Sequence, residues 1–173
     1  MTNSRQSNLA FVLGFAVLAL ALALNGYFYY KSTARLVANE SAVNQSHEVL
    51  RASEQLISLM KDAETGQRGY IITGEPEYLE PYLTAKGGLS DPIKKLRELL
   101  KDNLEQLHRL DQITPIVNAK IAELDESIKL RRELGENAAR RLVKTDRGRV
   151  LMDQLRELVA AMNQEELALL DNR

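Results

Sequence analysis

The chain has 173 residues, contains no cysteine and is 45% hydrophobic, which is enough for one domain with a buried core. Its 23 basic and 24 acidic side chains give a net charge of −1, so the composition offers no electrostatic support for binding nucleic acid. The absence of cysteine excludes a disulfide framework, a cysteine-ligated zinc site and covalent attachment of c-type haem.

The first predicted element is a transmembrane helix at residues 9–30. Residues 9–24 (LAFVLGFAVLALALAL) are an unbroken apolar run, and the aromatic residues Tyr27, Tyr29 and Tyr30 follow it. A helix over 9–30 would be about 33 Å long, close to the roughly 30 Å of a bilayer core. The tyrosines stand where an interfacial aromatic belt is expected. We therefore expect a tail at 1–8, a membrane span at 9–30 and the lipid bilayer as a partner.

A cleavable signal peptide is the alternative interpretation of the same segment. Ala21, Leu22 and Ala23 match the small-residue pattern of a cleavage site, and Arg5 supplies the positive charge that precedes the apolar stretch. The aromatic run favours the anchor, because it suits a membrane interface. In both interpretations the residues after about position 30 are translocated across the membrane.

Residues beyond Tyr30 predict a first helix that runs to about Arg68. Apolar residues recur every seven positions, and a second set widens the stripe: Leu36, Val43, Leu50 and Ile57, with Val49, Leu56, Met60 and Ala63. Asn39, Ser46 and Ser53 introduce polar side chains along this seam.

Glycine and proline predict an irregular second helix. Gly74 suits the end of the first helix, and Pro76 suits the first turn of the next. Pro81 and the pair Gly87–Gly88 weaken the second helix, and Asp91–Pro92 is expected to cap and restart it. Asn103 then predicts an N-cap, with Gln106 three residues later as in a capping box.

The third and fourth helices complete the bundle. The third is predicted from a heptad pattern that extends from Leu107 through Gly135 to Leu142, with Pro115 as a kink or a late start. Residues 145–148 form the expected turn, and the last helix has apolar residues at three-four spacing: Leu151, Leu155, Leu158, Met162 and Leu169. The predicted fold is therefore all-α: an N-terminal transmembrane helix that continues into an up-down-up-down four-helix bundle over 31–173.

A charged cluster near the end of the first helix is the main candidate site. Glu64 and Gln67 fall on the apolar seam, and Arg68 lies one turn after Glu64, where an ion pair forms readily. A buried carboxylate requires a cation or water, so this cluster is either a polar pin that fixes helix register or a ligand-responsive group.

Further cations and a tyrosine belong to the same candidate cluster. Arg140 and Arg141 are the expected partners from the third helix. Arg131 fits the seam better, but it lies about 18 Å before Val143 along the helix, whereas Glu64 is expected near the distal turn. Tyr70 is expected to cap the core beside the cluster, although an aromatic small-molecule pocket is an alternative. Gly66 and Gly69 predict either a close approach of another helix or a loosened last turn of the first helix.

The sequence favours no metal, cofactor or catalytic site. Glu105 and His108 have the Glu-x-x-His spacing of di-iron bundles, but Asn44 replaces the acid that should accompany His47. No phosphate-binding loop, serine elbow, metalloprotease motif or kinase signature is present. We therefore predict that this chain is not an enzyme and carries no cofactor.

The segment DAETGQRGYIITGEPEYLEPYLTA (62–85) resembles the signature of the type-three CHASE domain, an extracytoplasmic sensory module of bacterial receptors. LLKDNLEQLHRL (99–110), IAELDESIKLRR (121–132), KTDRGRVLMDQLRELV (144–159) and EELALLDNR (165–173) also fit the family in order. Leu104 departs from it, since proline is common at that position. The resemblance covers roughly residues 31–173.

This resemblance implies a periplasmic or extracellular four-helix sensor domain between two transmembrane helices, in the inner membrane of a bacterium. Such domains belong to histidine kinases, diguanylate cyclases or chemoreceptor-like proteins, so we expect a homodimer that responds to a small-molecule or protein stimulus. The second span and the output domain are expected to follow residue 173. The alternative is a membrane-tethered helical scaffold or spacer that binds no ligand.

Overall fold

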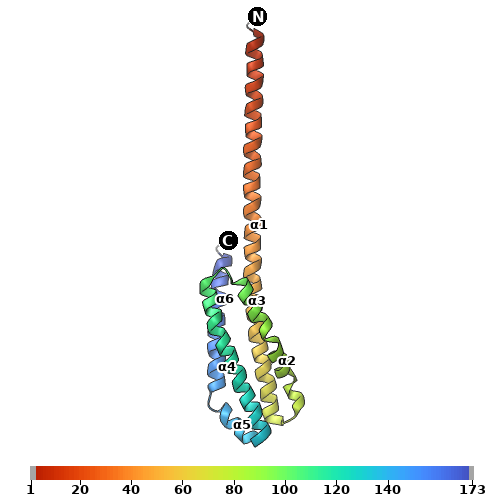
Figure 1. The fold of residues 1–173 in the computed structure, drawn as a ribbon, viewed down its shortest axis with the longest axis vertical. Coiled ribbons are helices and arrows are strands. Elements are labelled where there is room, and N and C mark those ends of the chain that lie inside the picture. The colour runs from red at the N-terminus through yellow and green to blue at the C-terminus, as the bar shows by residue number, and fades with distance from the viewer. Residues whose placement is uncertain (1–2, 172–173) are drawn as a thin grey trace. The chain divides into compact units, whose positions relative to one another are not determined.

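A computed structural model describes the backbone of residues 3–171 and the side chains of residues 20–33 and 40–171. The chain divides into two compact units, Met1–Val43 and Asn44–Arg173, and each is described separately. Residues 3–171 contain six α-helices, one 3₁₀ helix and no strand (Figure 1). The predicted all-α class is therefore confirmed.

The first unit contains the N-terminal part of α1 (Asn3–Thr73). The side chains of Tyr27, Tyr29 and Tyr30 are exposed, and the Tyr27 ring meets Phe28 edge-on with 5.8 Å between the ring centroids. Within the described residues, no helix combines the length and the apolar character that a membrane crossing requires. The predicted span at 9–30 falls partly on residues 9–19, whose side chains lie outside the described part, so it stays a prediction.

The second unit is the helical bundle. After α1 come η1 (Pro76–Leu79), α2 (Glu80–Gly88), α3 (Ser90–Leu99), α4 (Leu104–Leu134), α5 (Glu136–Val143) and α6 (Arg147–Asp171) (Figure 1). Gly74 has φ +78°, a left-handed conformation that suits glycine, and Pro76 opens the 3₁₀ helix. The predicted stop and restart at these two residues are both confirmed.

Two other boundary predictions were wrong. Asp91 does not cap a helix: α3 begins at Ser90, and Leu89 occupies its N-cap with helical angles, so α2 and α3 are nearly continuous. The third helix does not continue through Gly135, because this glycine adopts φ +84° and separates α4 from α5. The apolar heptad persists across the break, which explains why the pattern alone indicated one helix. The predicted N-cap is confirmed, since Asn103 Oδ1 accepts from Gln106 N at 3.1 Å.

Hydrogen bonds between the turns establish the direction of each helix. Gln45 of α1 donates to the carbonyl of Leu99 at the end of α3. Asn103, at the start of α4, donates to Glu165 Oε1 of α6 at 3.0 Å. The beginning of this unit and the last turns of α6 therefore meet the α3–α4 turn at one end of the bundle. The turns after α1 and α5 lie at the other end, which is the predicted up-down-up-down order.

The bundle encloses two apolar clusters. The larger one combines residues of α1, α3, α4 and α6, including Leu56, Leu96, Leu110, Ile113 and Leu155, all with no measurable exposure. Burial of each such side chain contributes about 1.5–3 kcal/mol. The smaller cluster packs η1 and α2 against α1 and α4 and contains Tyr70, Leu79, Tyr82, Leu124 and Ile128.

The α1 seam is centred on the second predicted set of residues. Val49, Leu56, Met60 and Ala63 are buried, whereas Leu50 and Ile57 are half-buried. Of the predicted polar seam positions, Ser46 and Ser53 are buried, and Asn39 lies outside the described side chains.

Candidate functional site

The glycines of the signature segment allow η1 and α2 to pack directly on α1. A Cβ atom at Gly66 would lie 2.7 Å from the backbone nitrogen of Tyr82, and one at Gly69 would lie 2.7 Å from Cδ1 of Tyr78. Both distances are shorter than real Cβ contacts. The predicted close approach at Gly66 and Gly69 is therefore confirmed, and it explains these two glycines of DAETGQRGYIITG as packing requirements.

A nearly inaccessible lysine forms the centre of the candidate site. The Lys120 side chain of α4 is only 2% exposed, and its Nζ lies 3.1 Å from Glu123 Oε2 and 3.6 Å from Glu64 Oε1. Glu123 is 4% exposed, while Glu64 reaches the surface at 16%. A charge buried this deeply is stabilised only by paired opposite charges, and here they come from both α1 and α4.

Hydrogen bonds between uncharged side chains extend the site around Lys120. Gln67 Nε2 of α1 donates to Ser127 Oγ of α4 at 2.6 Å, and Ser127 Oγ donates to the carbonyl of Leu124 at 2.7 Å. Both side chains are buried. We refer to Glu64, Gln67, Lys120, Glu123 and Ser127 together as the Lys120 cluster.

Gly148 allows α6 to pack against the Lys120 cluster, so that three helices, α1, α4 and α6, meet there. A Cβ at this position of α6 would lie 2.6 Å from Glu123 Oε2 and 2.7 Å from Lys120 Nζ. The first turn of α6 therefore covers the buried ion pair with backbone rather than with a side chain. A cavity of about 120 Å³ lies here, lined by Glu64, Lys120, Glu123 and Gly148 among others. It is polar and large enough for a few water molecules.

The sequence-predicted residues are only partly brought together. Arg68 Nη2 pairs with Glu64 Oε1 at 2.8 Å, as its spacing predicted. Among the described residues, none of the three expected arginine partners forms an ion pair with Glu64. Arg140 instead pairs with Glu136 at 3.1 Å on α5, because the break at Gly135 ends α4 before these residues.

The other two expected partners lie elsewhere. Arg141 is exposed on α5. The guanidinium of Arg131 lies against Gly74 at the α1 turn, where a Cβ would be 2.6 Å from Nη2, and its Nε is buried without a hydrogen-bond partner in the described part of the chain. Lys120 therefore supplies the interhelical cation that was expected from an arginine.

Tyrosines occupy the neighbouring core. Tyr70 is 6% exposed, as expected for a core cap. Tyr82 donates its hydroxyl to Asp125 Oδ1 at 2.5 Å, and Lys86 Nζ lies 2.8 Å from the same carboxylate. Burial first, and then the hydrogen bond to Asp125, raise the pKa of Tyr82 from 10.0 to about 12. Partial burial would raise the pKa of Asp125, but the hydrogen bonds from Lys86 and Tyr82 outweigh it and lower that pKa. This triad joins α2 to α4.

A second polar cluster ties the start of α4 to the end of α6. Gln106 is completely buried and donates to the carbonyl of Met162 at 3.1 Å and to Glu166 at 3.3 Å. Arg109 Nη1 donates to Gln106 at 2.6 Å and to Glu165 at 2.9 Å. We refer to Asn103, Gln106, Arg109, Glu165 and Glu166 as the Gln106 cluster. In it the arginine and Glu165 remain partly exposed, at 18% and 27%.

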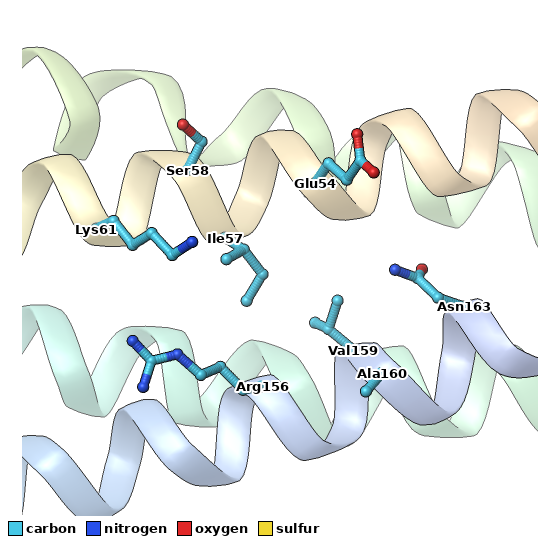
Figure 2. Close-up of a pocket in the computed structure, with 8 residues that line it drawn as sticks. All are labelled: Glu54, Ile57, Ser58, Lys61, Arg156, Val159, Ala160 and Asn163. Carbon is cyan, nitrogen blue, oxygen red and sulfur yellow. The ribbon is translucent and has the colours of Figure 1, made fainter.

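A shallow groove of about 340 Å³ separates α1 from α6 (Figure 2). Ile57 and Val159 point toward each other across it, and Lys61 and Arg156 lie at one end. Asn163 lies at the other end, and its Oδ1 is buried without a hydrogen-bond partner among the described residues. The groove therefore runs along the boundary between α1 and α6.

Metal ligation has no visible basis in the described part of the chain. No group of three or more His, Asp or Glu side chains is arranged there to hold an ion. His47 and His108 are both exposed.

Sequence reasoning identified Glu64, Gln67 and Arg68 but missed Lys120, Glu123, Ser127 and Gly148. Lys120 precedes the seam residue Ile121, so it resembles a surface lysine at the edge of an apolar stripe. A usable signal was present: Lys120, Glu123 and Ser127 recur at helical spacing on the same face as Leu124.

Comparisons with known proteins agree with this architecture. Residues 39–173 match the family model of the CHASE3 domain. Among solved structures, the sensor domain of the histidine kinase HK9 of Rhodopseudomonas palustris is similar, with a TM-score of 0.68 and 25% identity over 73% of this chain and 99% of that one. No curated protein matches the sequence. Because the family match spans most of the chain and includes both polar clusters, the chain belongs to the CHASE3 family of extracytoplasmic sensor domains.

Proposed function

We propose that this sensor domain relays a stimulus by repacking α1 and α6 around the Lys120 cluster of α4. The helices α1 and α6 are the first and last of the bundle, so a displacement between them is the signal that a membrane-spanning receptor can transmit. The similar HK9 domain belongs to a histidine kinase, which supports a kinase as one possible output of such a receptor.

The observation that carries this proposal is the buried ion pair at the contact of three helices. Lys120 reaches Glu123 on its own helix and Glu64 on α1, and the backbone at Gly148 of α6 covers the pair. Replacing a buried ion pair by apolar side chains is often neutral or stabilising, so stability alone does not require it. A core held by a few polar contacts has alternative pairings of similar energy, which a switch needs and a rigid spacer does not.

The membrane context belongs to the same proposal. Residues 9–30 serve as the span, and Tyr27, Tyr29 and Tyr30 lie at its outer interface, where their exposed rings suit lipid headgroups. The receptor resides in the bacterial inner membrane as a homodimer, with the bundle in the periplasm. Its stimulus is a small molecule or a protein.

A chimeric receptor tests the relay. Residues 1–173 are joined to the second membrane span and kinase of a transmembrane histidine kinase that drives a fluorescent reporter. Lys120→Met is expected to change basal reporter output severalfold at equal membrane abundance, because it breaks the pairing between α1 and α4. Lys129→Met is the matched control, since Lys129 is an exposed lysine of the same helix.

Disulfide cross-linking reports the motion directly. The chain has no cysteine of its own, so Ile57→Cys on α1 and Ala160→Cys on α6 can be introduced across the groove of Figure 2. Lys120→Met is expected to change the rate of cross-linking in membranes, and Lys129→Met is not. If Lys120→Met folds but leaves both output and cross-linking unchanged, the domain acts as a passive spacer and the relay is wrong.

The double variant Lys120→Met/Glu123→Leu distinguishes a change in signalling from simple unfolding. This double variant removes both buried charges and should retain stability. It is still expected to alter output, because the pairing to Glu64 is gone.

A further inference from the structure

A second cavity lies next to the Lys120 cluster, between the last turns of α1 and α5. Its volume is about 450 Å³, within the range of roughly 300–1,000 Å³ that is typical of small-molecule sites. Ile71, Ile72 and Val143 provide its apolar walls. Ile71 is 5% exposed and the adjacent Ile72 is 70% exposed, so part of the apolar wall faces solvent. We call this cavity the α1–α5 pocket.

The rim of the α1–α5 pocket is positively charged. Arg68, Arg140 and Lys144 line it together with one acid, Glu136. Arg140 pairs with Glu136 at 3.1 Å and Arg68 with Glu64 at 2.8 Å. For Lys144, the described residues provide no ion pair. The pocket therefore offers an excess of cations above an apolar floor, and part of that excess is not neutralised within the chain.

We propose that the α1–α5 pocket binds a small organic carboxylate with an apolar body. A carboxylate at the rim would accept hydrogen bonds from Lys144 and from the guanidinium groups, which are the strong charge-assisted type. The apolar body would cover Ile71, Ile72 and Val143. An inorganic anion leaves the apolar walls exposed, and a neutral hydrocarbon leaves the cations unpaired, so neither matches both features.

Arg68 connects this pocket to the Lys120 cluster. It lines both cavities, and its partner oxygen, Glu64 Oε1, lies 2.8 Å from Arg68 and 3.6 Å from Lys120. A bound carboxylate competes with Glu64 for Arg68. Glu64 then pairs with Lys120 alone, which alters the contact between α1 and α4. This coupling rests on the proposed relay and names the class of stimulus that would drive it.

Binding is tested on the full 173-residue chain in lipid nanodiscs, with benzoate as the probe. Isoleucine δ1-methyl NMR spectra are recorded during titration, with acetate and benzyl alcohol as controls that lack the apolar ring or the charge. Benzoate is expected to shift the Ile71 and Ile72 signals saturably, and both controls are expected to bind roughly tenfold more weakly or less. Saturable binding of benzyl alcohol equal to that of benzoate would remove the case for a carboxylate.

Matched variants locate the site. Lys144→Ala is expected to weaken benzoate binding roughly tenfold, the effect of losing about one charge-assisted hydrogen bond. Lys61→Ala is the control, because Lys61 is an exposed lysine of the α1–α6 groove. A larger effect of Lys61→Ala than of Lys144→Ala would place the ligand in that groove and overturn the assignment. Isoleucine shifts that follow protein concentration instead of benzoate would identify a second copy of the chain as the occupant.

Glu64→Gln separates this inference from the proposed relay. The variant keeps the pocket and frees Arg68, so benzoate should bind equally or more tightly. In the chimeric receptor, the reporter response to benzoate should nevertheless be lost. If benzoate fails to bind while Lys120→Met still changes output, the ligand class is wrong and the relay stands. If benzoate binds at the pocket but Lys120→Met leaves output unchanged, the pocket stands and the relay is wrong.

Discussion

The Lys120 cluster and the Gln106 cluster both join α4 to neighbouring helices through buried polar groups, but they place their cations differently. Lys120 is 2% exposed and sits between two carboxylates in the interior. Arg109 is 18% exposed and pairs with Glu165 at the edge of the bundle, while the neutral amide of Gln106 occupies the buried centre.

This difference in the placement of the cation distinguishes a contact that holds helices together from one that allows them to move. The Gln106 cluster also contains a buried carboxylate, Glu166 at 4% exposure, but its cation, Arg109, stays at the edge of the bundle in contact with water. Its cation therefore costs less in desolvation than Lys120 does. The Lys120 cluster keeps a full charge inside, and any loss of one partner leaves another charge unpaired. The end of the bundle with the Gln106 cluster is therefore expected to be the more rigid, and the region around Lys120 the more responsive.

The largest expected effect is on Lys120 itself. Lys120→Met should lower the free energy of unfolding by about 3–5 kcal/mol, because Glu123 is left buried without its cation. Urea denaturation followed by circular dichroism measures this loss. Lys129→Met, on the exposed face of the same helix, should change stability by less than about 0.5 kcal/mol.

The double variant Lys120→Met/Glu123→Leu sharpens this result. It should recover most of the stability, since both charges are removed together. A single variant as stable as the native chain would mean that Lys120 is solvated in solution, and the contrast between the two clusters would disappear.

Replacement of Gln106 should have a smaller effect. Gln106→Leu removes the donor to Glu166 and the acceptor of Arg109 while keeping an apolar contact, so the expected loss is about 1–3 kcal/mol. Thermal denaturation compared with Gln112→Leu, an exposed position of α4, measures it. A loss as large as that of Lys120→Met would show that the buried amide is as critical as the buried charge.

The sequence was sufficient to predict the helical class, the turn at Gly74 and Pro76, and the N-cap at Asn103, because each depends on local backbone chemistry. It also identified Glu64 and Gln67, since polar residues on an apolar seam stand out in the pattern. Lys120 did not stand out in the same way, although its helical spacing with Glu123 and Ser127 indicated the face on which it lies. Its burial depends on Gly148, which is distant in sequence and lies against it only after α6 has packed.

The partner of Glu64 illustrates the same limit. Arg140 and Arg141 were reasonable candidates if the third helix continued through Gly135. The positive φ of that glycine ends α4 and diverts both arginines onto α5, where Arg140 pairs with Glu136. A heptad pattern records which residues are apolar, but it does not record a single left-handed residue that interrupts the helix.

The smallest expected effect concerns the exposed side of the Gln106 cluster and its dependence on pH. Partial burial alone would raise the pKa of Glu165, but hydrogen bonds from Arg109 and Asn103 outweigh it and lower the pKa below the ordinary value of 4.5. A carboxyl whose pKa is lowered by folding stabilises the native state above its unfolded pKa and loses that contribution as pH falls through the folded pKa. Stability should therefore decline from about pH 4.5 downward.

Glu165→Gln isolates this contribution from that of the other carboxylates. The variant should lose no more than about 1 kcal/mol at pH 7, the range of exposed ion pairs, because Glu165 remains accessible to solvent. The difference in unfolding free energy between the variant and the native chain should shrink toward zero at acidic pH, as Glu165 becomes protonated in the native chain as well. Urea midpoints at pH 7, 5, 4 and 3 measure this convergence. A difference that stays constant across these values would mean that Glu165 acts through packing rather than through its charge, and the cluster would then depend on its neutral members alone.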